Sequence, residues 1–76
     1  MKRVKLSKVE FSKNDEYSYD VFVNEDRYGK LVFDKEHFVW DLWSIDGGTD
    51  VFYFKDLKET QDTITEEIHD FDNEDF

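Results

Sequence analysis

Cysteine and proline are absent from this 76-residue sequence, and glycine occurs only three times. The lack of cysteine excludes disulfides, a thiol nucleophile and cysteine-ligated metals. Basic residues are also scarce, with 10 lysines and arginines against 20 aspartates and glutamates, which disfavours direct binding of nucleic acid. No apolar run has the length of a signal sequence or a membrane span, so we expect a cytoplasmic protein.

Aromatic side chains make up 18% of the chain and compensate for its small size. A domain of this length buries only about 60% of its unfolded surface, whereas each aromatic side chain buries roughly 150–250 Å². We therefore expect a single folded domain over residues 1–70, despite a charged fraction of 39%. Residues 71–76 are expected to form an acidic, frayed tail.

Five short segments have the alternation of apolar and polar residues that is typical of β-strands. The gaps between them contain Asn, Asp and Gly and have the length of hairpin turns, so we predict an α+β fold with a five-stranded antiparallel meander. A slip in the alternation near Ser7 and Lys8 predicts a bulge or bend. The predicted strands are Val4–Phe11, Tyr17–Asn24, Tyr28–Asp34, Phe38–Ile45 and Val51–Phe54.

One amphipathic helix is predicted at the C-terminal end, from Leu57 to His69. Asp56 and Glu59 have the spacing of a capping box, which marks the start of a helix. Apolar or neutral residues then recur every three or four positions and define the face that would pack on the sheet: Leu57, Gln61, Ile64 and Ile68.

A single helix covers only one face of such a sheet. The alternation places Tyr19, Val21, Leu31, Phe33, Trp40 and Leu42 beneath the helix. The opposite face would hold Phe22, Val32, Val39, Trp43 and Ile45, which is more apolar than a plain solvent surface. Two interpretations are open: this face is an interface anchored by Phe22 or Trp43, or the sheet curls and buries both faces.

The negative charge is concentrated at the C-terminal end, where residues 56–76 contain nine carboxylates and one lysine. On a helical wheel Glu59, Asp62, Glu66 and Asp70 form one stripe opposite the apolar face. Like charges four residues apart, and acids near a helix C-terminus, both destabilise a helix, so helix stability does not explain the stripe. It serves either solubility or recognition of a basic partner.

No catalytic or metal-binding motif is present. Gly47 and Gly48 are typical of a hairpin turn, because no helix follows them directly to bind phosphate. Asp70, Asp72 and Glu74 have the alternate spacing of a calcium loop, but the chain lacks the glycine and the final glutamate of an EF-hand. We therefore expect no enzyme activity, no cofactor and no metal.

The last residues, Asp72-Asn73-Glu74-Asp75-Phe76, resemble the acidic tips of single-strand DNA-binding proteins. That resemblance implies that the terminal Phe docks in a pocket of a client enzyme. The chain has no linker and no basic OB-type body ahead of these residues, which favours an ordinary frayed tail.

Together these observations favour a small acidic protein-binding module. It would inhibit a basic, nucleic-acid-handling protein or complex by occlusion or nucleic-acid mimicry, as a phage or mobile-element anti-defence protein does. The alternative is a structural or accessory protein that dimerises through the aromatic sheet face, with its acidic end serving solubility. The predicted partner-binding residues are Glu59, Asp62, Glu66, Glu67, Asp70, Asp72, Phe22 and Trp43.

Overall fold

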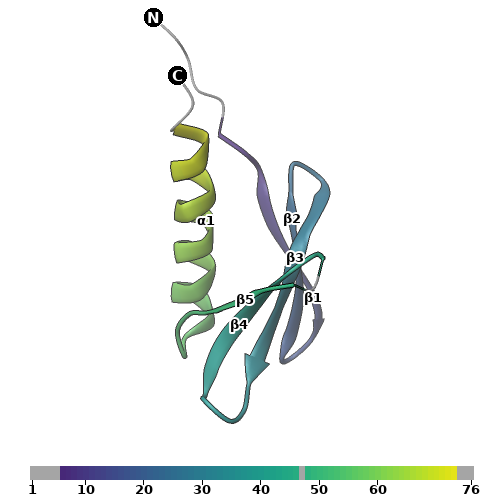
Figure 1. Ribbon diagram of the computed structural model, residues 1–76, viewed down its shortest axis with the longest axis vertical. Coiled ribbons are helices and arrows are strands. Elements are labelled where there is room, and N and C mark those ends of the chain that lie inside the picture. Colours follow the sequence, from purple (N-terminus) through teal and green to yellow (C-terminus); the bar gives the residue numbers. More distant parts are fainter. Residues whose placement is uncertain (1–5, 47, 74–76) are drawn as a thin grey trace, which may run out of the picture.

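Six elements follow one another along the chain in the computed structural model, which describes residues 6–46 and 48–73 (Figure 1). They are β1 (Val9–Asp15), β2 (Ser18–Val23), β3 (Asp26–Asp34), β4 (Val39–Ser44), β5 (Asp50–Phe52) and α1 (Leu57–Asn73). Each strand pairs antiparallel with its neighbour in sequence, in the order β1-β2-β3-β4-β5. The predicted α+β meander is confirmed, and the sheet does not close into a barrel.

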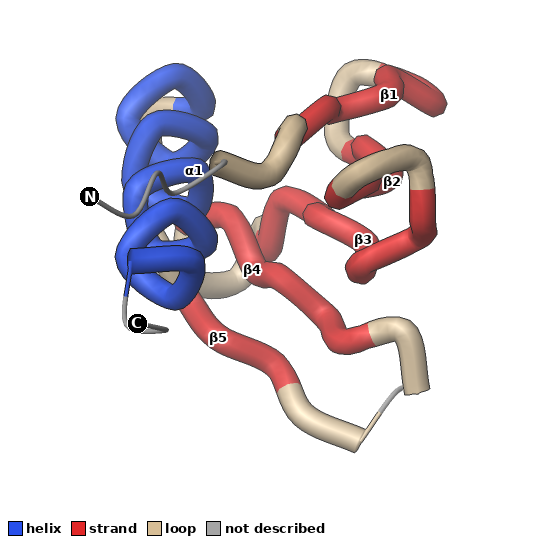
Figure 2. Tube along the Cα trace, turned by 90° about the horizontal axis from the view of Figure 1, so that it is seen from above, coloured by secondary structure: helices blue, strands red, loops and turns tan. Residues whose placement is uncertain are grey.

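The core lies between α1 and one face of the sheet (Figure 2). Its buried side chains are Val21, Leu31, Trp40, Leu42, Ile64 and Ile68. Tyr19 and Phe33 are partly buried against this cluster, and both rings contact Trp40 edge-on, at centroid distances of 5.8 and 5.3 Å. The alternation in the sequence therefore identified the face beneath the helix correctly.

The turn between β2 and β3 consists of two residues in the left-handed conformation. Asn24 and Glu25 have φ values of 53° and 72°, as a type I′ hairpin turn requires. Asn24 also extends the β1–β2 pairing: its side-chain oxygen accepts a hydrogen bond from the Lys8 N–H at 2.9 Å, and its own N–H donates to the Lys8 carbonyl at 2.8 Å. Glycine would adopt this conformation at lower cost than Glu25.

The first strand differs from its prediction. It begins at Val9 and continues through Asp15, where we predicted a turn, and the Tyr17 N–H donates a hydrogen bond to the Asp15 carboxylate at 2.8 Å to form the actual turn. Ser7 and Lys8 precede the strand, so the slip in the alternation marks the approach to the strand and not a bulge within it. Residues 1–5, the start of the predicted strand, lie outside the described residues.

An unpredicted bulge does occur where β2 pairs with β3. Val21 pairs with Gly29 and Phe22 with Arg27, which leaves Tyr28 as the extra residue. Tyr28 lines a cavity together with Ile68 and other residues of α1. Glycine is required beside the bulge, because a Cβ atom at Gly29 would collide with the backbone carbonyl oxygen of Trp43.

The start of α1 agrees with its prediction, whereas its end does not. Asp56 caps the first turn, since its carboxylate accepts a hydrogen bond from the Glu59 N–H at 2.9 Å. The helix continues past its predicted end at His69 to Asn73, so residues 71–73 are helical and do not form a frayed tail. Residues 74–76, the rest of the predicted tail, lie outside the described residues.

Thr60 fastens the first turn of α1 to the segment that leaves β5. Its side chain is fully buried, and the hydroxyl accepts a hydrogen bond from the Phe54 N–H at 3.2 Å and donates one to the Phe54 carbonyl at 3.3 Å. The sequence pattern did not single out Thr60, because this contact joins a helix to a segment six residues earlier in the chain. The contact fixes where the helix begins over the sheet.

Candidate protein-binding surfaces

The acidic stripe on α1 is fully presented to solvent. Glu59, Asp62, Glu66 and Asp70 are all exposed, on the side of the helix opposite the buried Ile64. Asp62 has a partner that we did not predict, because Lys58 lies one turn before it with 3.4 Å between the ammonium and the carboxylate. Both side chains are solvent-exposed, so this ion pair contributes at most about 0.5 kcal/mol. The last turn of the helix contains no basic residue.

Glu67 belongs to the flank of the helix and faces the sheet. Its carboxylate accepts a hydrogen bond from the Tyr53 hydroxyl at 2.6 Å. Burial, together with this hydrogen bond, raises the pKa of the Tyr53 phenol. Glu67 therefore helps to join α1 to the segment after β5. Asp72 lies within α1, but its side chain is outside the described part of the structure.

Phe22 and Trp43 lie on the outward face of the sheet, away from α1. Phe22 is half-buried and pairs with Glu10 on one side and Arg27 on the other. Trp43 is more exposed, at 41%. Charged side chains stand between the two aromatic residues in the register, so they do not form one continuous apolar patch.

The predicted partner-binding residues thus fall into two groups on opposite sides of the molecule. The stripe on α1 points away from the sheet, whereas Phe22 and Trp43 are on the face of the sheet that α1 does not cover. Figure 2 shows α1 lying on one side of the sheet. Both layers of the fold separate the two groups. One flat partner surface cannot contact both at once, so each surface has to be considered alone.

Asp41, a residue that the sequence analysis did not select, lies in the middle of β4 on the outward face. Its cross-strand neighbours on this face are Val32 of β3 and Phe52 of β5. Only 5% of Asp41 is exposed, and its Oδ1 atom has no hydrogen-bond partner among the described residues. A buried charge normally has an ion partner or several donors beside it. The signal in the sequence was a single acid within the otherwise apolar run Val39-Trp40-Asp41-Leu42-Trp43.

Asp41 is an unusually weak acid, mainly because it is buried. Burial raises the pKa of this carboxyl from 3.8 to about 6, and a hydrogen bond to Asp50 and the negative charge of Asp50 act in the same direction. Asp50 is exposed and pairs with Trp43 at the adjoining position of β5. Asp50 is therefore a neighbour whose negative charge opposes ionisation of Asp41.

The turn between β3 and β4 borders Asp41 and holds two further titratable groups. The Asp34 carboxylate accepts hydrogen bonds from the Glu36 and His37 N–H groups at 2.8 and 3.2 Å and contacts the His37 ring nitrogen at 3.0 Å. The side-chain contact is the main reason why the pKa of Asp34 is lowered and that of His37 is raised. Phe38 ends the turn with a φ of 58°, which is uncommon for a bulky residue, and is 60% exposed.

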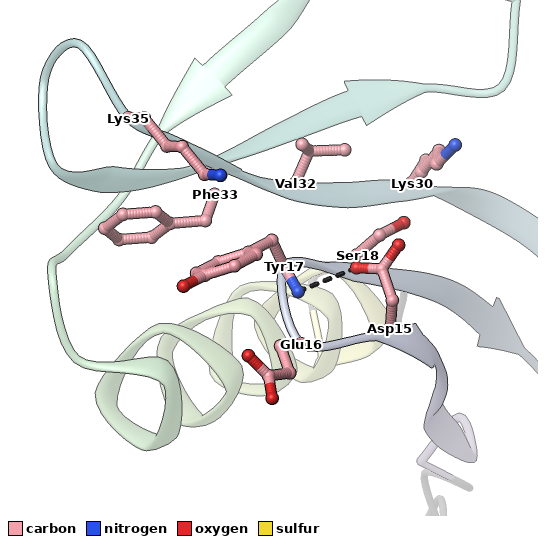
Figure 3. A pocket seen from close by; sticks show the side chains of 8 residues that line it. All are labelled: Asp15, Glu16, Tyr17, Ser18, Lys30, Val32, Phe33 and Lys35. Atoms are coloured by element: carbon pink, nitrogen blue, oxygen red, sulfur yellow. Dashed lines mark hydrogen bonds between the residues drawn. The ribbon is translucent and has the colours of Figure 1, made fainter.

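A pocket of about 600 Å³ lies beside the β1–β2 turn, at the same end of the sheet as the β3–β4 turn, which contributes Lys35 to its lining (Figure 3). The ammonium group of Lys35 lies over the Tyr17 ring at 4.4 Å, and the Phe33 ring lies 6.0 Å from the Tyr17 ring. Two lysines and two acids share the lining, so the pocket presents no charge of one sign to a ligand: Asp15, Glu16, Tyr17, Ser18, Lys30, Val32, Phe33 and Lys35.

A metal site and a membrane-spanning helix are both absent from residues 6–46 and 48–73. Within these ranges no three or more His, Asp or Glu side chains are grouped so that they could hold a metal ion. The helix in the same part of the chain lacks the length and apolar character needed to cross a membrane.

No protein family, curated protein or solved structure matches this chain. Its function therefore has to be argued from the two surfaces.

Proposed function

We propose that the protein is a small binding module that uses the acidic stripe of α1 to occupy a basic surface on a nucleic-acid-handling protein. The observation that carries the proposal is the row of four exposed carboxylates on one side of the helix, of which only Asp62 has an ion partner among the described residues. The arrangement costs helix stability, because Glu66 and Asp70 are like charges one turn apart close to the negative end of the helix dipole. A charged surface that is present despite this loss of helix stability is consistent with recognition of a partner protein.

The spacing of the charges favours occlusion over close mimicry of DNA. Residues three or four apart on a helix provide one charge per roughly 5 Å of axis, whereas duplex DNA carries one per ~1.7 Å. The stripe would guide the module to a basic groove, and the body of the domain would then exclude the nucleic acid sterically. Such a module would act in the cytoplasm, and a phage or mobile element would use it against a host defence protein.

The alternative, a dimer formed through the sheet face, has less support. The outward face alternates aromatic and charged residues, and a two-fold axis that passes close to Asp41 would place a second Asp41 and Asp50 against the first pair. Repulsion between buried carboxylates would oppose that association. A heterologous basic partner has no such penalty.

Charge reversal on the helix tests the proposal. The variant Glu66→Lys/Asp70→Lys leaves the Lys58–Asp62 pair intact and should not reduce stability, because Lys at position 66 gains Asp62 as a neighbour one turn earlier and cations suit the helix C-terminus. Captured proteins would be recovered from a host lysate with the wild-type chain as bait and eluted by salt. A captured nucleic-acid-binding protein should then lose its DNA or RNA when the wild-type module is added, and keep it when the variant is added.

The matched control is Glu16→Lys/Glu36→Lys, which changes the net charge equally at two exposed turn positions away from α1. It should bind the captured protein as the wild type does. Equal loss of binding in both double variants, or binding that is insensitive to salt, would contradict recognition by the stripe and leave it a role in solubility.

A further inference from the structure

The charges around Asp41 leave its carboxylate without compensation. Asp50 on β5 and Asp34 on β3 both oppose ionisation, and His37 in the β3–β4 turn is the group that favours it. His37 is already paired with Asp34, at 3.0 Å. Lys30 on β3 occupies a diagonal register position, but no ion pair between described residues includes Asp41 or Asp50. The position therefore lacks a cation.

Aromatic side chains surround this pair of carboxyl groups. Trp43 follows two residues later on the same face of β4, and Phe52 lies directly across on β5, with exposed fractions of 41% and 50%. The His37 ring lies 5.3 Å from the Phe52 ring at the border of the face. Phe38 is exposed there in a strained left-handed conformation, and strain of this kind is concentrated at functional sites.

We propose that this face binds an arginine side chain of a partner protein, with the guanidinium between the carboxylates of Asp41 and Asp50 and stacked on Trp43 or Phe52. A guanidinium binds carboxylates through paired N–H groups and stacks on aromatic rings, and it is more weakly hydrated than a lysine ammonium. Asp50 is exposed and provides the entrance. Asp41 lies between Val32 and Phe52, and Phe52 is half-exposed, so binding requires the Phe52 side chain to move aside.

This site goes beyond the proposed function, because it lies on the side of the molecule opposite the α1 stripe and does not depend on it. The charge pattern decides between occupants. A second copy related by a two-fold axis close to Asp41 would add carboxylates to the pair, and a metal ion would find no group of three ligands among the described residues. An arginine side chain brings the positive charge and the N–H donors that the site lacks, and its flat guanidinium group can stack on the aromatic rings.

The experiment uses the full chain and N-acetyl-arginine amide as the probe, with binding followed by NMR at about pH 7.5, above the pKa of about 6 of the Asp41 carboxyl. The probe should shift the resonances of Asp41, Asp50 and Trp43 saturably, with a dissociation constant on the order of millimolar for a single side chain. N-acetyl-citrulline amide, which has the same shape without the charge, should leave them unchanged. Lowering the pH well below the Asp41 pKa of about 6 protonates this carboxyl and should abolish the changes in the resonances.

Variants assign the effect to the site. Asp41→Asn should weaken binding of the probe about tenfold or more, because it removes a charged hydrogen-bond acceptor. Asp26→Asn, at an exposed position, makes the same change of charge elsewhere and should bind like the wild type, as should Glu66→Lys/Asp70→Lys.

Three results would overturn the proposal. They are equal shifts with the citrulline probe, undiminished affinity in Asp41→Asn, and self-association that Asp41→Asn removes, since the last would assign the face to a second copy of the chain. Circular dichroism of each variant checks that the fold is retained.

Discussion

Replacing Asp41 by Asn should make the protein more stable at neutral pH, although it removes a charged residue from the middle of the sheet. The pKa of Asp41 is raised from 3.8 to about 6, chiefly by burial. A pKa raised by this much corresponds to about 3 kcal/mol. Because the folded-state pKa is raised, the stabilising contribution is present below the unfolded-state value and is lost as the pH rises through about 6.

The asparagine side chain resembles the protonated acid, since its amide can donate a hydrogen bond to Asp50 as a protonated Asp41 would. The variant should therefore be more stable than the wild type by about 2–3 kcal/mol near pH 7.5, and the difference should shrink by about 2 kcal/mol near pH 4.5. Urea unfolding of both proteins at the two pH values, followed by tryptophan fluorescence, measures the difference. Comparison with the wild type cancels the titration of the other groups.

Asp46 provides a control, because its pKa is shifted in the opposite direction from that of Asp41. Hydrogen bonds from the Ser44 hydroxyl and the Gly48 N–H, at 2.5 and 3.0 Å, lower the pKa of Asp46. Its contribution is therefore present above its ordinary pKa and lost as the pH falls, so Asp46→Asn should destabilise the protein near neutral pH and less so in acid. The reasoning about Asp41 is refuted if Asp41→Asn is less stable than the wild type near pH 7.5, or if its effect does not vary with pH.

Two further substitutions test the fold. Glu25→Gly should stabilise the protein by about 1 kcal/mol, because Glu25 has a φ of 72°, whereas Glu16→Gly, in a turn without positive φ, should not. Thermal unfolding of both variants decides this, and equal changes in both would contradict strain at Glu25. Thr60→Val should cost about 1–3 kcal/mol through the two lost hydrogen bonds to Phe54. Thr65→Val, on a less buried part of α1, should cost less, and equal losses measured by urea unfolding would show that Thr60 does not fasten the helix.

Recognition at the sheet face would explain why a destabilising Asp41 is kept. Binding sites commonly carry charges and strained conformations that cost stability in the free protein. Asp41 in β4 and Phe38 in the turn that precedes this strand are two such costs. If Asp41→Asn is both more stable and deficient in arginine binding, stability and recognition are opposed at this position.

The sequence by itself determined the features that depend on neighbouring residues. Alternation fixed which side of β2 carries Tyr19 and Val21, because successive side chains on a strand point to opposite faces. Short gaps between strands fixed the meander, and Asp56 fixed the start of α1 through a cap that reaches only three residues. Each of these is decided within about one turn or one hairpin of the chain.

Only the tertiary structure decided the features that require several strands to be in register. Alternation placed Asp41 on the outward face, as for Trp43, but its burial depends on Val32 and Phe52, which reach it from two other strands. The bulge at Tyr28 is likewise a property of a pair of strands. The separation of the α1 stripe from the aromatic face is also decided by the tertiary structure. The sequence shows both surfaces, but they lie on opposite sides of the molecule only because the helix and the sheet pack around a shared core.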